Sequence, residues 1–129
     1  MIGIQRAIEN GDAADLNTAI NRLICAYAIV FGFGGIPLLY MGDELGMLND
    51  ESYKNDPAKA DDNRWIHRPK MDWALAERAA KGEGVAGRVY EQIGKLITAR
   101  KSLASIHASV TAETEVKNDG ALLLIRRKH

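Results

Sequence analysis

Residues 23–41 limit the fold of this chain more than any other stretch. These nineteen residues carry no charge, and a run of that length could by itself span a membrane. Its second half contains four residues that break helices, namely Gly32, Gly34, Gly35 and Pro37. The stretch therefore predicts a buried helix ending near Phe31, a glycine turn, and a short buried strand over residues 36–40.

The residues before the glycine turn have the period of a helix. Residues 4–9 predict a short helix that stops before Gly11, and Asp12 is suited to cap the next helix. That second helix has apolar residues three and four apart from Leu16 onward, the spacing of one buried face. Because it becomes apolar all round toward its end, we expect it to pack on more than one side, with Cys25 as a small buried filler.

The run over residues 36–40 is too short for a helix and lacks alternating polar residues. It fits a strand covered on both faces, as in a parallel sheet. Parallel strands need parallel neighbours, and the sequence shows no second strand of this kind. We therefore expect the chain to be cut from something larger.

The second half of the chain combines a polar loop, helices and a hairpin. The Asn-, Asp- and Pro-rich residues 48–69 predict a long loop, and long loops without secondary structure are commonly functional or disordered. Asp72 is suited to cap a short helix, and a clearer helix is predicted over residues 85–103. Residues 112–116 and 121–126 then predict a hairpin with an Asn-Asp-Gly turn.

The composition argues against several classes of partner. Seventeen basic residues balance seventeen acidic ones and aromatic residues make up 6%, so we expect neither nucleic acid nor a membrane surface as a partner. A small uncharged molecule or a protein fits better. The first six residues lack the charged region and apolar core of a secretion signal. The location stays open, with the cytoplasm favoured.

Two longer sequence segments resemble a known family. GGIPLLYMGDELG (residues 34–46) and LNDESYKNDPAKADDNRWIHRPKMDW (residues 48–73) resemble the region around the eighth strand of amylosucrase-like members of the α-amylase family, glycoside hydrolase family 13. Residues 9–35 are similar to the helix before that strand. The glycine-flanked strand indicates the α-amylase family as a whole, whereas DPAKADDNRW and HRPKMDW indicate the amylosucrase-like group.

The resemblance implies an α/β fold that is mainly helical in this fragment. Residues 1–103 would be the last segment of a (β/α)8 barrel, with residues 36–40 as its eighth strand and residues 48–71 as a loop. Residues 104–129 would begin a C-terminal antiparallel β domain. In such a barrel, the residues just past each strand face the ligand.

Three candidate substrate-binding residues follow from the resemblance. Asp43 and Glu44 leave the eighth strand on the ligand face, although capping a turn or pairing with a cation would explain them equally well. Arg64 matches an arginine that pairs with an upstream aspartate at the closed end of the glucosyl pocket, which suits a planar guanidinium. A structural ion pair within the loop is the alternative for Arg64.

The implied activity belongs to a longer parent protein. That parent would cleave sucrose, hold the glucosyl unit on an aspartate and pass it to an α-glucan, without a cofactor or metal. The family's catalytic carboxylates follow earlier strands and no residue here matches their motifs, so we expect no catalytic residue in this chain and no activity from it alone. A fragment of a hydrolytic α-amylase or α-glucosidase, or a self-associating helical module without enzyme activity, are the alternatives. The isolated chain is expected to self-associate, because its unpaired strand must be covered.

Overall fold

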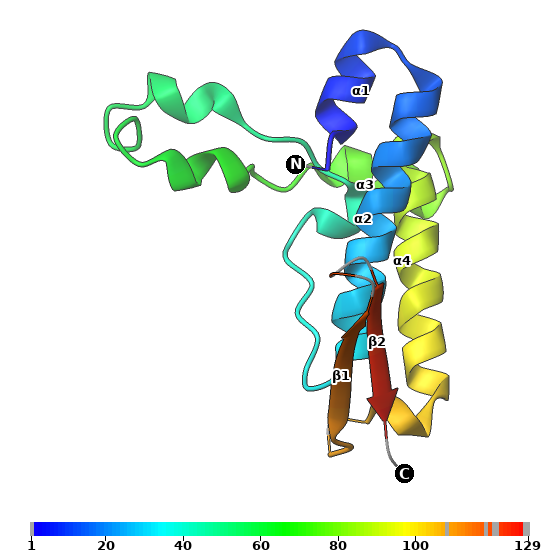
Figure 1. Ribbon diagram of the computed structural model, residues 1–129. Helices are drawn as coiled ribbons and strands as arrows, with labels where there is room; N and C mark the ends of the chain where they lie inside the picture. The colour runs from blue at the N-terminus through cyan, green and yellow to red at the C-terminus, as the bar shows by residue number, and fades with distance from the viewer. Residues whose placement is uncertain (1, 108, 118, 120–121, 128–129) are drawn as a thin grey trace.

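The structure is a computed structural model that describes residues 2–107, 109–117, 119 and 122–127. Its helices are α1 (Ile4–Asn10), α2 (Ala13–Phe33), α3 (Trp73–Ala80) and α4 (Gly84–Ser102). The hairpin strands are β1 (Ala112–Lys117) and β2 (Leu122–Arg127). Figure 1 shows α2 and α4 running side by side, with α1 folded back at one end of α2.

The helices begin where the sequence predicts them. The Asp12 carboxylate accepts hydrogen bonds from the backbone N–H groups of Ala14 and Asp15, at 2.8 and 3.0 Å. The Asp72 carboxylate accepts one from the N–H of Leu75 at 2.9 Å. Both caps satisfy donors that the first helical turn leaves free, so the two predicted N-caps are confirmed.

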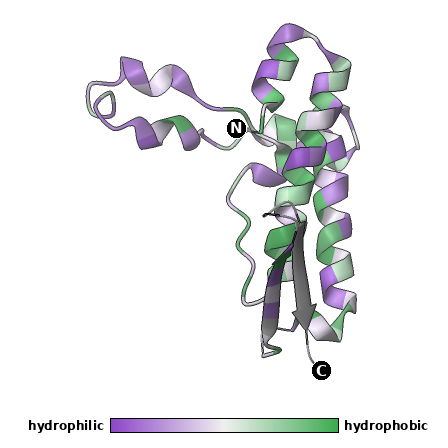
Figure 2. Cartoon of the chain, in the orientation of Figure 1, coloured by the Kyte–Doolittle hydropathy of each residue, from purple (hydrophilic) through white to green (hydrophobic). Residues whose placement is uncertain are grey.

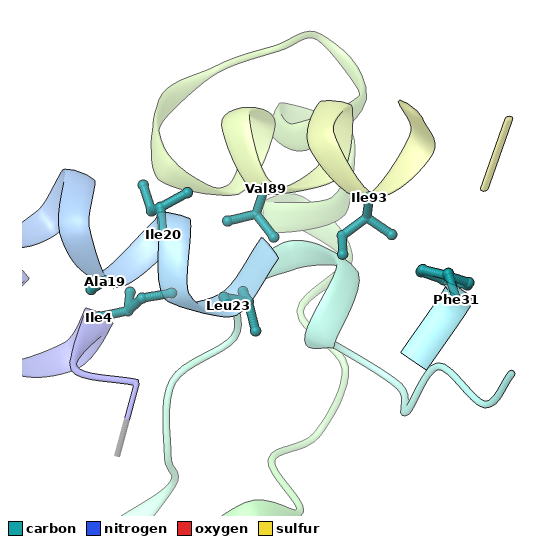
Figure 3. Packing of buried hydrophobic residues seen from close by; sticks show 7 residues of the cluster. All are labelled: Ile4, Ala19, Ile20, Leu23, Phe31, Val89 and Ile93. Atoms are coloured by element: carbon teal, nitrogen blue, oxygen red, sulfur yellow. The ribbon is translucent and has the colours of Figure 1, made fainter. Parts of the chain in front are cut away.

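A small core lies between α2 and α4. Ile20 from α2 and Val89 and Ile93 from α4 are at most 2% exposed, and Figure 3 shows Val89 and Ile93 reaching from α4 toward α2. A second cluster joins α3 and α4 to Leu45, which belongs to the short 3-10 turn η1 (Asp43–Leu45). This second cluster holds the turn after residues 36–40 against α3 and α4.

Residues 36–40 do not form the predicted strand. They are assigned no secondary structure, and Ile36 and Leu38 are 92% and 78% exposed. Within the described residues, the backbone groups of residues 36–39 make no hydrogen bond. The prediction of a strand covered on both faces is therefore wrong for this chain, because a strand requires a paired neighbour and the described chain offers none.

Helix α2 packs on one side only. Its buried residues face α1 and α4, whereas Cys25, Ile29 and Val30 are exposed. The predictions of packing on more than one side and of a buried Cys25 are both wrong, since nothing in the described chain covers the far side. By length and composition alone α2 could cross a membrane, although a core helix meets the same criteria.

The loop and the hairpin complete the chain. Residues 48–69, which we call the arm, contain the 3-10 turns η2 (Glu51–Asn55) and η3 (Asn63–His67) and project away from the helices (Figure 1). The arm is largely hydrophilic (Figure 2). Strands β1 and β2 pair antiparallel with Thr114 opposite Ile125, which confirms the predicted hairpin. Residues 118, 120 and 121 of the predicted turn and second strand lie outside the described residues.

Candidate functional site

The turn after residues 36–40 is built on glycines. Gly42 and Gly46 flank η1 with φ angles of 93° and 61°, a left-handed region that side chains with a Cβ rarely adopt. A Cβ on Gly42 would also lie 2.6 Å from the sulfur of Met47. Inside the turn, the Glu44 carboxylate accepts a hydrogen bond from the Gly42 N–H at 3.0 Å. Glu44 thus folds back on its own turn, the capping role that the sequence left open.

Asp43 points the other way and contacts α2. Its Oδ2 accepts a hydrogen bond from the hydroxyl of Tyr27, sixteen residues upstream. Burial of the phenol, together with this hydrogen bond and the negative charge of Asp43, raises the pKa of Tyr27 well above its usual value. Tyr27 therefore stays a hydrogen-bond donor at any physiological pH and holds one oxygen of the carboxylate in place.

Arg64 lies in the arm and pairs with a near neighbour. Its guanidinium donates from Nε and from one terminal nitrogen to the two oxygens of Asp62, each at 2.8 Å. The Asp62 carboxylate also caps η3 by accepting from the Arg64 backbone N–H at 3.0 Å. These bonds hold the pKa of Asp62 below its usual range. The Arg64 side chain is 72% exposed, so its contact in this chain is the structural ion pair of the alternative interpretation.

The structure does not join the three predicted site residues to one another. Within the described residues, Arg64 makes no hydrogen bond or ion pair with Asp43 or Glu44. The base of the arm does come close to Asp43, because His67 lines the same two hollows as Asp43. His67 itself hydrogen-bonds Asn49 through Nδ1 at 3.1 Å, and so ties the two ends of the arm together.

A cleft of about 500 Å³ opens between α1 and the turn. Its apolar floor comes from α1, from Leu23 of α2 and from Met47 and Leu48. Six polar side chains line it, namely Gln5, Arg6, Glu9, Asp43, Asn49 and His67. An apolar floor with convergent polar groups is the usual composition of a small-molecule site, and every group named here belongs to this chain.

The carboxylates of the site are not arranged for glycosidic bond cleavage. A retaining mechanism needs two carboxyl groups about 5 Å apart that face each other across the scissile bond. Asp43 and Glu44 are sequence neighbours that turn to different partners, Tyr27 and the Gly42 N–H. No group of three or more His, Cys, Asp or Glu side chains in the described part of the chain is placed to hold a metal ion. The arrangement suits binding rather than bond cleavage.

Tyr27 is the site residue that the sequence interpretation missed. Its position on the apolar face of α2 predicted a core residue, and its ring does pack against Phe31 with centroids 6.0 Å apart. A signal was available, because a tyrosine on a buried face usually finds a hydrogen-bond partner for its hydroxyl. Sequence spacing could not say that the partner is Asp43.

The chain is similar in sequence to a known enzyme of glucoside metabolism. No family model matches the chain. The chain is 29% identical over 106 residues to glucosylglycerate phosphorylase of Escherichia coli (strain K12), a match that covers 81% of this chain and 18% of that protein. The chain thus spans less than a fifth of the relative's length. The similarity is to a carbohydrate-active enzyme, and it does not single out the amylosucrase-like group or sucrose as substrate.

Proposed function

We propose that this chain is the last segment of a (β/α)8 barrel in a retaining, glucosyl-transferring enzyme. The match to glucosylglycerate phosphorylase over most of the chain carries the proposal, since that name denotes an enzyme that removes a glucosyl unit from a glucoside. The apolar residues 36–40, bare on both edges, are what a barrel strand without its neighbours would look like. In this proposal η1 lies at the carboxyl end of the strand, where barrels bind ligands.

The donor of the parent protein is proposed to be sucrose and the acceptor an α-glucan. The words DPAKADDNRW and HRPKMDW support this finer assignment through their resemblance to the amylosucrase-like group. In the first step, the anomeric carbon of the glucosyl unit would pass from fructose to an enzyme carboxylate, with a proton delivered to the leaving oxygen. In the second step, a glucan hydroxyl would give its proton back to the acid/base residue and bond to the anomeric carbon, which releases the carboxylate. The carboxylates for both steps would lie outside this chain. This chain would supply part of the pocket wall, with Arg64, Asp43 and Glu44 as substrate contacts.

Phosphorolysis is the second candidate, and the similarity to a phosphorylase favours it. Phosphate would then accept the glucosyl unit from the same covalent intermediate, and the product would be a glucose phosphate rather than a longer glucan. This chain would line the donor pocket in both reactions, because the acceptor enters only after the donor glucoside is cleaved.

Product analysis on the parent protein tests both candidates. The parent is incubated with sucrose and glycogen, with and without inorganic phosphate, and the sugars are separated by chromatography. We expect fructose and an elongated glucan. If glucose phosphate appears only when phosphate is present, the reaction is phosphorolysis rather than transfer to a glucan. If free glucose is the sole glucose product, the reaction is hydrolysis. No cleavage of any glucoside would contradict the proposal, as would sucrose turnover by the 129-residue chain alone.

An Arg64 variant of the parent tests the pocket role. Arg64→Lys keeps the charge but loses the planar fork that binds a carboxylate through two bonds, so kcat/KM for sucrose should fall by about tenfold or more. Arg88→Lys, an exposed change on α4, is the matched control and should leave kcat/KM unchanged. Equal activity in both variants would reduce Arg64 to the structural ion pair seen with Asp62.

A further inference from the structure

The cleft beside η1 contains one acceptor that is fixed but unused. Tyr27 occupies Oδ2 of Asp43, while Oδ1 makes no hydrogen bond to any described residue. Asp43 is half-buried and lines the cleft. A carboxylate held by one oxygen has lost most of its rotational freedom, so its second oxygen is presented in a defined direction without a further entropy cost on binding.

The other polar groups of the cleft complement this acceptor. Gln5 Nε2 donates to Glu9 Oε1 at 3.1 Å, which leaves the second N–H of Gln5 and the second oxygen of Glu9 for a ligand. Arg6 and the amide nitrogen of Asn49 supply further donors. The charges of Arg6 and Glu9 oppose each other, and the fixed carboxylate of Asp43 disfavours an anion. An apolar floor with both donors and acceptors above it matches a neutral, polyhydroxylated molecule, whose hydroxyls donate and accept and whose C–H faces are apolar.

We propose that this cleft binds a neutral sugar, with Asp43 Oδ1 accepting a ligand hydroxyl and Tyr27 acting as the positioning residue that holds Asp43 for it. The inference deepens the proposed function and rests on it for the choice of a glucoside as ligand. The cleft itself is made by this chain's own residues, so binding is testable without the rest of the parent.

Two variants of the 129-residue chain isolate the two oxygens of Asp43. Tyr27→Phe removes only the hydroxyl and keeps the ring that packs on Phe31, which frees the carboxylate to rotate. Asp43→Asn keeps the shape but replaces the charged acceptor by a neutral amide. Asp61→Asn makes the same chemical change on an exposed position of the arm, away from the cleft lining, and is the matched control.

Sugar binding is measured by NMR titration of the backbone amides with sucrose and with methyl α-D-glucopyranoside. We expect saturable shifts at Met47, Leu48 and Asn49 in the wild-type chain and in Asp61→Asn. Affinity should fall by about fivefold in Tyr27→Phe, because the freed carboxylate must be ordered on binding. It should fall by about tenfold or more in Asp43→Asn, because a hydrogen bond to a charged acceptor is stronger than one to a neutral amide. Unfolding in urea is followed for every variant to separate binding from stability.

Each result of the titration either supports or overturns the proposal. Weaker binding in Tyr27→Phe, under conditions where the urea unfolding curve shows the variant fully folded, supports the positioning role, because a merely structural contact would change stability and not affinity. Equal sugar affinity in wild type and Tyr27→Phe overturns it. The absence of saturable shifts in the wild-type chain, or shifts caused by inorganic phosphate but not by the sugars, overturns the ligand class. If the parent cleaves no glucoside while the chain binds sugar as described, the proposed function fails and this inference stands.

Discussion

The side chains of the helical core and of residues 36–40 are both apolar, but most of them differ in their surroundings. Ile93 of α4 is 1% exposed, whereas Ile36 is 92% exposed and Leu38 is 78% exposed. Ile93 lies opposite α2, so its side chain leaves water on every side. Ile36 and Leu38 have the composition of a buried strand but meet no partner in the described chain.

An apolar sequence therefore shows that a segment would be stabilised by burial, but it does not show that the segment is buried in a given chain. Helix α4 satisfies its own backbone hydrogen bonds and needs only one neighbour to bury its apolar face. A strand must pair its backbone with another strand before its side chains can be covered. Ile36 and Leu38 therefore stay exposed, while Leu39 of the same segment packs on the helical core.

An isoleucine-to-alanine change in each region should give the largest difference in the free energy of unfolding. Ile93→Ala removes buried methyl groups and leaves a cavity, so the free energy of unfolding should fall by about 2–5 kcal/mol. Ile36→Ala removes the same atoms from a site already in water and should change it by less than about 0.5 kcal/mol. Urea unfolding followed by circular dichroism measures both, and similar losses would show that residues 36–40 are buried in solution.

The contact between α4 and the turn before it should be nearly as sensitive. A Cβ on Gly87 would lie 2.2 Å from the carbonyl carbon of Gly82, so Gly87→Ala forces the backbone apart and should cost about 1–3 kcal/mol. Gly94→Ala is the control in the same helix, where a Cβ meets nothing within 4 Å. It should stabilise the chain by about 0.5–1 kcal/mol. The same sign in both variants would contradict the packing described here.

Self-association should depend on residues 36–40 and not on apolar exposure in general. Bare strand edges pair readily, and a lysine on such an edge opposes pairing. Leu38→Lys should therefore weaken association of the isolated chain by about tenfold or more, measured by light scattering over a concentration series. Ile8→Lys, at an exposed apolar position of α1, is the control and should associate like the wild type. A wild-type chain that stays monomeric at high concentration would count against the prediction.

A substitution in the arm should have the smallest effect on stability, because hydrogen bonds rather than buried side chains hold the arm in shape. Arg64 lowers the pKa of Asp62, first through its side-chain hydrogen bonds and then through its backbone N–H. A depressed folded-state pKa stabilises the arm above the ordinary aspartate pKa, and this contribution is lost as the pH falls through the lowered value. Arg64→Gln should raise the Asp62 pKa toward its ordinary range in an NMR titration, while Arg88→Gln should not move it.

Local features could be predicted from the sequence, and long-range ones could not. Asp12 and Asp72 cap helices through bonds that reach only two or three residues along the chain, so their pattern is visible in the sequence. The Tyr27 to Asp43 bond spans sixteen residues and depends on how α2 meets η1.

Burial also failed to follow from local sequence. Leu38 and Cys25 were predicted to be inside because their neighbours are apolar, yet exposure depends on which other segments are present.

Arg64 was predicted to meet an upstream aspartate, and in this chain it meets Asp62, two residues away. The sugar-binding roles of Arg64, Asp43 and Glu44 remain predictions.

Amide hydrogen exchange at Leu38, Leu39 and Tyr40 tests the central claim most directly. The account holds that residues 36–40 are a barrel strand that pairs only within a longer protein. Exchange is compared between the parent protein and this chain, diluted until light scattering gives a monomer. We predict near-intrinsic exchange in the isolated chain and at least about hundredfold slower exchange in the parent. Equal rates in the two would contradict the account.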